Sequence, residues 1–161
     1  MKNVVCLVVA VLLFSTADGA VVRLAPDVSW PGSGQAPRSL KSLRGQAVVL
    51  VIADGPGSRA FRKQVRWLEE TYSSLAARQV VFVAALKQGD GPVQSNIPFA
   101  VANNGAAVAQ AYGVQDKFAL VIIGKDGNID YQTDRVQTGA RVRDIIQNAF
   151  PVQSAARRAL P

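Results

Sequence analysis

The chain has 161 residues, of which 49% are hydrophobic and 18% are charged, a composition that excludes an intrinsically disordered protein. Its 18 lysines and arginines outnumber its 11 aspartates and glutamates, so the protein is basic, with a formal net charge of +7 at pH 7. Histidine is absent and Cys6 is the only cysteine. We expect no metal site and no cofactor, because no cluster of histidines or carboxylates is visible in the sequence.

Residues 1–20 have the features of a secretion signal. Lys2 provides a positive start, residues 4–14 form an uninterrupted apolar run, and small residues suit cleavage after Gly19 or Ala20. The run is shorter than the ~20 residues that a membrane-spanning helix needs. We therefore expect a secreted or periplasmic protein that is not membrane-spanning; a buried N-terminal strand is the alternative. Cleavage would remove Cys6 but leave the net charge unchanged, because one lysine and one aspartate are lost together.

The first half of the chain begins without regular structure. Residues 21–38 contain three prolines and two glycines and predict an irregular leader with at most a short edge strand. Residues 39–45 predict a short helical turn that ends at glycine. Residues 47–53 (AVVLVIA) are typical of a strand covered on both faces, and the Asp-Gly-Pro-Gly sequence of residues 54–57 ends it.

A helix is expected to begin at Ser58, which is a suitable N-cap residue. Its apolar residues recur at helical spacing: Phe61, Val65, Leu68, Tyr72 and Leu75. Residues 79–86 (QVVFVAAL) predict a second buried strand, and residues 87–104 predict a longer connection.

The second half continues the alternation of helices and strands. A short helix, a strand, a partner strand and a final helix are expected over residues 105–112, 118–123, 129–133 and 138–150. The Asp-Gly pair within residues 125–128 predicts the hairpin turn between the two strands. Pro151 is expected to end the last helix, and residues 151–161 to form a flexible basic tail.

Several stretches, taken in order, match a known family. They are Pro26-Asp27, the leucine-rich turn with Arg44-Gly45 and its buried strand, residues 111–114 (AYGV), and residues 124–129 (GKDGNI). Over residues 39–150 this order resembles the thioredoxin-like superfamily, in particular its exported thiol reductases and peroxiredoxins. The resemblance implies an α/β, three-layer fold with a central mixed sheet of four to five strands flanked by helices.

The chain departs from that superfamily at its reactive site. Active members carry a Cys-x-x-Cys pair at the start of the first helix, where the helix dipole stabilises a thiolate. Here Ser58 takes the place of the attacking cysteine, Phe61 that of the resolving cysteine, and Phe118 that of a cis-proline before the third strand. Disulfide exchange and peroxidase activity are therefore not expected. The chain is most similar to exported thioredoxin-like domains, of undefined biochemical role, that lack the cysteine pair.

Four cations at the start of this helix lie three, four and seven residues apart and share one face: Arg59, Arg62, Lys63 and Arg66. Cations in a first helical turn oppose the helix dipole, at a cost of about 0.3 to 1 kcal/mol each. Beside a Gly-Pro-Gly-Ser helix start, they indicate a site, shared with Ser58, for a carboxylate, sulfate or phosphate group. The alternative is a solvated face whose charge is partly offset by Glu69 and Glu70.

Two functional hypotheses follow. In the first, the chain is a redox-inactive binding module for an unknown protein or an anionic polymer; nucleic acid is not an expected partner of an exported protein. In the second, it is an enzyme of unrecognised type that uses Asp54, Ser58 and the basic helix face on a small substrate. No catalytic residue is assigned, because Asp54 has no visible partner and is typical of a turn. Trp30 and Trp67 are expected to cover apolar surface; the alternative for Trp30 is an exposed binding anchor.

Overall fold

The computed structural model describes residues 23–158 except 33, 35 and 90, and for residues 150–158 it describes the backbone alone. The predicted signal peptide at residues 1–20 lies outside this part. Within it, no helix is long and apolar enough to cross a membrane.

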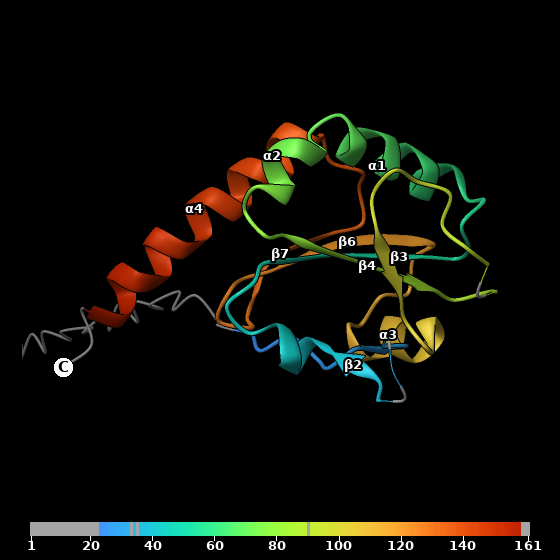
Figure 1. The fold of residues 1–161 in the computed structure, drawn as a ribbon, viewed down its shortest axis with the longest axis horizontal. Coiled ribbons are helices and arrows are strands. Elements are labelled where there is room, and N and C mark those ends of the chain that lie inside the picture. Colours follow the sequence, from blue (N-terminus) through green and yellow to red (C-terminus); the bar gives the residue numbers. More distant parts are fainter. Residues whose placement is uncertain (1–22, 33, 35, 90, 159–161) are drawn as a thin grey trace, which may run out of the picture.

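A five-stranded mixed sheet forms the centre of the fold, in the order β5-β4-β3-β6-β7 (Figure 1). β3 (Val48–Ala53) lies in the middle, parallel to β4 (Val81–Leu86) and antiparallel to β6 (Phe118–Ile123). β5 (Phe99–Val101) pairs in parallel with β4, and β7 (Ile129–Thr133) pairs antiparallel with β6. Every residue of β3 and β6 is buried, as their continuous apolar sequences predict. The expected central mixed sheet is confirmed.

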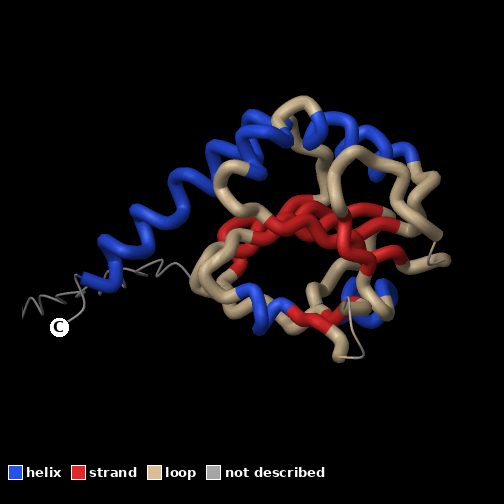
Figure 2. Tube along the Cα trace, viewed as in Figure 1, coloured by secondary structure: helices blue, strands red, loops and turns tan. Residues whose placement is uncertain are grey.

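Helices cover both faces of the sheet, as Figure 2 shows. Alternate residues of β3 point to opposite faces, so Val49 and Val51 pack with the α1 side and Leu50 and Ile52 with the α3 side. The first side holds α1 (Arg59–Glu69), α2 (Tyr72–Ala76) and α4 (Gly139–Arg158); the second holds α3 (Gly105–Ala111) and the N-terminal segment (Figure 1). The fold therefore has the three layers expected of an α/β protein.

The leader contains more structure than its sequence suggests. β1 (Ser29–Trp30) and β2 (Arg38–Ser39) pair antiparallel, where at most one short strand was predicted, and lead into a 3-10 helix, η1 (Leu40–Leu43). Trp30 is only 4% exposed and packs in the hydrophobic cluster on the α3 side of the sheet. Its predicted covering role is confirmed, and the alternative of an exposed anchor is wrong.

Three further elements differ from the predicted ones. The helix that begins after Ser58 breaks before Tyr72, because Thr71 leaves the helical conformation and its hydroxyl bonds to the Trp67 and Leu68 carbonyls. β5 lies within the connection predicted without a strand. α4 continues through Pro151 to Arg158, so residues 151–158 are helical and not the predicted tail. The alanines and arginines that follow the proline are among the residues with the highest helix propensity.

Candidate functional site

The loop of residues 54–58 connects the end of β3 to the start of α1. The backbone of Ser58 is extended, and its Oγ accepts a hydrogen bond from the Phe61 backbone N–H at 3.4 Å. This bond satisfies one of the N–H groups that the first turn of a helix leaves without a partner. The predicted N-cap is confirmed, and the hydroxyl in the place of the attacking thiol is engaged in a structural bond.

Phe61 and Phe118, which take the places of the resolving cysteine and the cis-proline, belong to the hydrophobic core. Phe61 is 2% exposed and Phe118 is 4% exposed, and both lie in the cluster between α1 and the sheet. Phe118 begins β6 and pairs with Ala53, the last residue of β3, so it lies at the same end of the sheet as the loop that carries Ser58. The ring of Phe61 also packs against Phe99 of β5, with centroids 6.2 Å apart. Apolar packing thus occupies this end of the fold.

Asp54 has a partner that the sequence analysis missed. Its Oδ1 lies 3.0 Å from Lys87 Nζ, which also donates a hydrogen bond to the Asp116 carbonyl at 2.5 Å. Asp54 follows the last residue of β3 and Lys87 follows the last residue of β4, and these two strands are in parallel register. The expectation of an unpartnered aspartate is therefore wrong, and both groups contribute to joining the strand ends.

The four cations predicted to share one face of α1 are all exposed. None of them forms an ion pair or side-chain hydrogen bond with another residue that the structure describes, so Glu69 and Glu70 make no direct ion pair with them within residues 23–158. The alternative of a solvated face remains open. Lys63 has one specific contact, with its Nζ 4.5 Å from the centre of the Trp67 ring. Among the residues with described side chains, Arg59, Arg62 and Arg66 have no carboxylate partner.

Two of these cations border a groove that the sequence did not predict. The groove has a volume of about 470 Å³ and lies between one side of α1 and the connection from β4 to β5. Its lining residues are Pro56, Gly57, Phe61, Arg62, Val65, Arg66, Glu69, Pro92 and Gln94. Arg59 and Lys63 lie outside it. The groove therefore combines unpaired positive charge with an apolar lining at the end of the fold where the sequence analysis placed a binding site.

The far wall of the groove is fixed to α1 through Glu69. One oxygen of its carboxylate, Oε1, accepts hydrogen bonds from Ser95 Oγ at 2.8 Å and from the Asn96 backbone N–H at 2.9 Å. Ser95 Oγ in turn accepts from the Ile97 backbone N–H at 3.0 Å. These bonds hold the connection that carries Pro92 and Gln94 beside the helix. Their long sequence separation gives no local pattern from which they could have been predicted.

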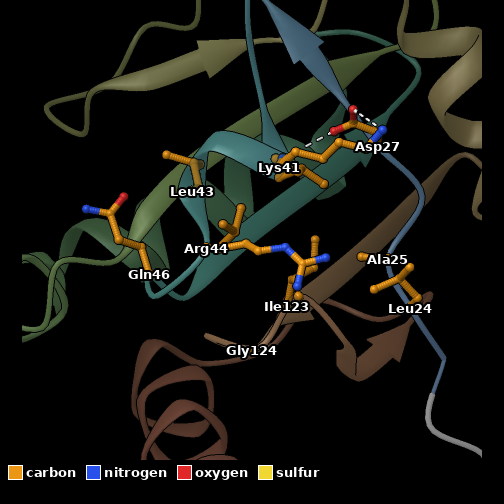
Figure 3. Close-up of a pocket in the computed structure, with 12 residues that line it drawn as sticks. Leu24, Ala25, Asp27, Lys41, Leu43, Arg44, Gln46, Ile123 and Gly124 are labelled. Carbon is orange, nitrogen blue, oxygen red and sulfur yellow. Dashed lines mark hydrogen bonds and ion pairs between the residues drawn. The ribbon is translucent and has the colours of Figure 1, made fainter.

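A second cavity lies on the opposite side of the sheet, among the N-terminal segment, η1 and the hairpin (Figure 3). Arg44 extends across it toward Ile123, and Asp27 pairs with Lys41 at 3.6 Å. Its volume is about 60 Å³, which accommodates no more than about two water molecules. This cavity is too small to be the binding site. No group of three or more potential metal ligands occurs among residues 23–158 outside the three omitted positions.

Comparison with known proteins gives matches among solved structures alone. No protein-family model and no curated protein sequence matches the chain. A Neisseria meningitidis protein named as a thioredoxin is 22% identical, with a TM-score of 0.64 over 83% of this chain and 94% of that one. A thioredoxin-family thiol:disulfide interchange protein from Chlorobium tepidum is 18% identical, with a TM-score of 0.61 over 81% and 98%. Plasmodium yoelii thioredoxin peroxidase I is 15% identical, with a TM-score of 0.60 over 87% and 94%.

The chain has the thioredoxin-like fold. The predicted resemblance is thus confirmed at the level of structure, across a sequence too divergent for the likeness to carry activity with it. Within this thioredoxin-like chain, the sole cysteine is Cys6, so no Cys-x-x-Cys pair is present anywhere in the sequence. The groove beside α1 is the feature that best suits a ligand.

Proposed function

We propose that the chain is an exported, redox-inactive thioredoxin-like domain that acts as a binding module for an anionic partner. In this proposal residues 1–20 direct secretion and are removed, and with them Cys6. The binding site is the basic face of α1 together with the groove beside it. The proposal places the protein in the periplasm or outside the cell, and groups it with thioredoxin-like domains that lack the cysteine pair.

One observation carries the proposal: Arg62 and Arg66 are exposed, have no carboxylate partner among the described residues, and border a groove with an apolar lining. The first turn of α1 holds no acidic residue that would balance them. Unpaired arginines beside apolar surface suit a ligand that offers a carboxylate, sulfate or phosphate group, because the planar guanidinium bonds such groups through two N–H donors.

The absence of thiol chemistry rests on the sequence. Disulfide exchange requires a thiolate that attacks and a second thiol that resolves the mixed disulfide. Ser58 and Phe61 supply neither. The alternative hypothesis, an unrecognised enzyme, relied on Ser58 and Asp54 as reactive groups. Both side chains form structural contacts, since Ser58 caps α1 and Asp54 pairs with Lys87.

Retention on immobilised heparin tests the proposed anion binding. Arg62→Glu combined with Lys63→Glu is expected to abolish retention at moderate salt, because the exchange places negative charge on the face that binds. The melting temperature should change little, since both side chains are exposed. The matched control is Arg38→Glu with Arg44→Glu, which makes the same charge change on the opposite side of the sheet and should retain binding. Equal retention of the wild type and the α1 variant would refute the proposal.

A further inference from the structure

We propose that the groove beside α1 binds an extended acidic segment of a partner protein, with a carboxylate held by Arg62 and Arg66 and a neighbouring apolar side chain packed on Pro56 and Pro92. This inference rests on the proposed function and names its ligand. It distinguishes a peptide in the groove from an anionic glycan spread over the basic face.

The cations of α1 divide into two pairs with different surroundings. Arg62 and Arg66 line the groove and lie one helical turn apart, which places them side by side on the helix surface. Arg59 and Lys63 do not line it, and Lys63 lies over the ring of Trp67. A ligand in the groove therefore meets two guanidinium groups, which suits a carboxylate bound through paired N–H donors.

The lining and size of the groove favour a peptide. Pro56 and Pro92 give it accessible apolar surface beside the nearly buried Phe61 and Val65. Its volume of about 470 Å³ falls within the range of roughly 300 to 1,000 Å³ typical of small-ligand sites. Such a volume holds a few side chains. A sulfated glycan has no apolar side chain to place there, and its charges would be distributed over all four exposed cations. A peptide can place an apolar side chain next to its carboxylate, and that side chain would contact the apolar part of the groove.

Glu69 sets the shape of the groove and the direction of the ligand. Its hydrogen bonds to Ser95 and Asn96 hold the opposite wall in place before any ligand binds, so little ordering is required on binding. Its negative charge lies one turn beyond Arg66 on the same helix and disfavours a second carboxylate at that end. The ligand carboxylate is thereby directed toward Arg62 and Arg66. Glu69 is a positioning residue in this arrangement.

Titration with peptides, followed through the backbone amide signals in NMR spectra, tests the inference. The probe is a capped tetrapeptide of alternating aspartate and leucine; its counterpart has asparagine in place of aspartate. The aspartate peptide should shift the signals of residues along the groove, and the asparagine peptide should bind about tenfold more weakly or worse. A heparin hexasaccharide serves as the glycan probe.

Two matched double variants locate the site. Arg62→Gln with Arg66→Gln should weaken the aspartate peptide about tenfold or more, whereas Arg59→Gln with Lys63→Gln, an equal loss of charge, should weaken it less than about threefold. Equal weakening by both pairs of substitutions would refute the groove as the peptide-binding site, and so would binding of the hexasaccharide but not the peptide. Either result would leave the proposed binding by the basic face of α1 standing. If neither probe shifts any signal of α1, the proposed function fails as well.

Two substitutions of Glu69 test whether its hydrogen bonds to Ser95 and Asn96 shape the groove. Glu69→Gln keeps an oxygen that accepts the bonds from Ser95 and Asn96 but removes the charge, so peptide affinity should be maintained or increased. Glu69→Ala removes the bonds that hold the wall, so affinity should fall about threefold or more. Equal loss in both variants would show that the charge, and not the position of the wall, is what matters, and would contradict the positioning role.

Discussion

The orientation of α1, which carries the basic face, depends on one buried amide. Gln64 is fully buried. Its Nε2 donates to the Gln137 carbonyl at 2.8 Å, and its Oε1 accepts from the Gln137 backbone N–H at 2.8 Å. The side chain thus pairs with both backbone groups of a residue 73 positions away and ties α1 to the segment that leads into α4.

Replacing Gln64 with leucine preserves the volume approximately but leaves both backbone groups of Gln137 without partners. Each unsatisfied buried group costs about 1–3 kcal/mol, so the free energy of unfolding should fall by about 3 kcal/mol. At roughly 2–4 °C per kcal/mol, the melting temperature should fall by about 6–12 °C. Urea denaturation followed by circular dichroism measures the change.

The control is Gln137→Leu, because the one described partner of the Gln137 side chain is the Arg135 carbonyl, at 3.3 Å in an exposed position. This variant keeps the backbone groups that Gln64 contacts, so its stability should stay within about 0.5 kcal/mol of the wild type. A loss of less than about 1 kcal/mol in Gln64→Leu, or equal losses in both variants, would refute the reasoning.

Two other predictions concern stability. Burial raises the pKa of the Tyr112 phenol, and Asp27 raises it further while Arg23 lowers it. A raised pKa stabilises the fold below the ordinary tyrosine value of about 10, and this contribution is lost as pH rises beyond it. Between pH 9 and 11, the wild type should therefore lose more stability than Tyr112→Phe in urea titrations; parallel losses would contradict the assignment. Gly139→Ala should cost about 1–3 kcal/mol, because the added Cβ would overlap the Trp67 backbone carbonyl oxygen and Thr71 Oγ1. Gly57→Ala, with nothing within 4 Å of the added Cβ, is the control and should unfold at nearly the wild-type temperature.

Elements with a strong local pattern could be predicted from the sequence. β3 and β6 are continuous apolar runs, and the Asp126-Gly127 turn joins β6 to β7 as expected. β5 was missed because it has three residues and depends on pairing with β4, where Phe99 lies beside Phe82. The length of α4 was missed because a proline within a helix is indistinguishable by sequence from one that ends it.

The sequence predicted only the part of the candidate site that follows from a local pattern. Helical spacing alone placed Arg59, Arg62, Lys63 and Arg66 on one exposed face. The groove beside them depends on a connection held by Glu69 and Ser95, 26 positions apart, which no local pattern encodes. The pairing of Asp54 with Lys87 was within reach, because each residue directly follows one of two predicted strands that are joined by a helix, the connection typical of parallel strands.

Reduction of insulin disulfides by dithiothreitol, with and without a protein that comprises residues 21–161, tests the central claim most directly. If this thioredoxin-like fold serves binding and carries no thiol chemistry, the rate with the protein should equal the rate in buffer, and Ser58→Ala should change nothing. A rate above that of buffer that is lost in Ser58→Ala would contradict the account.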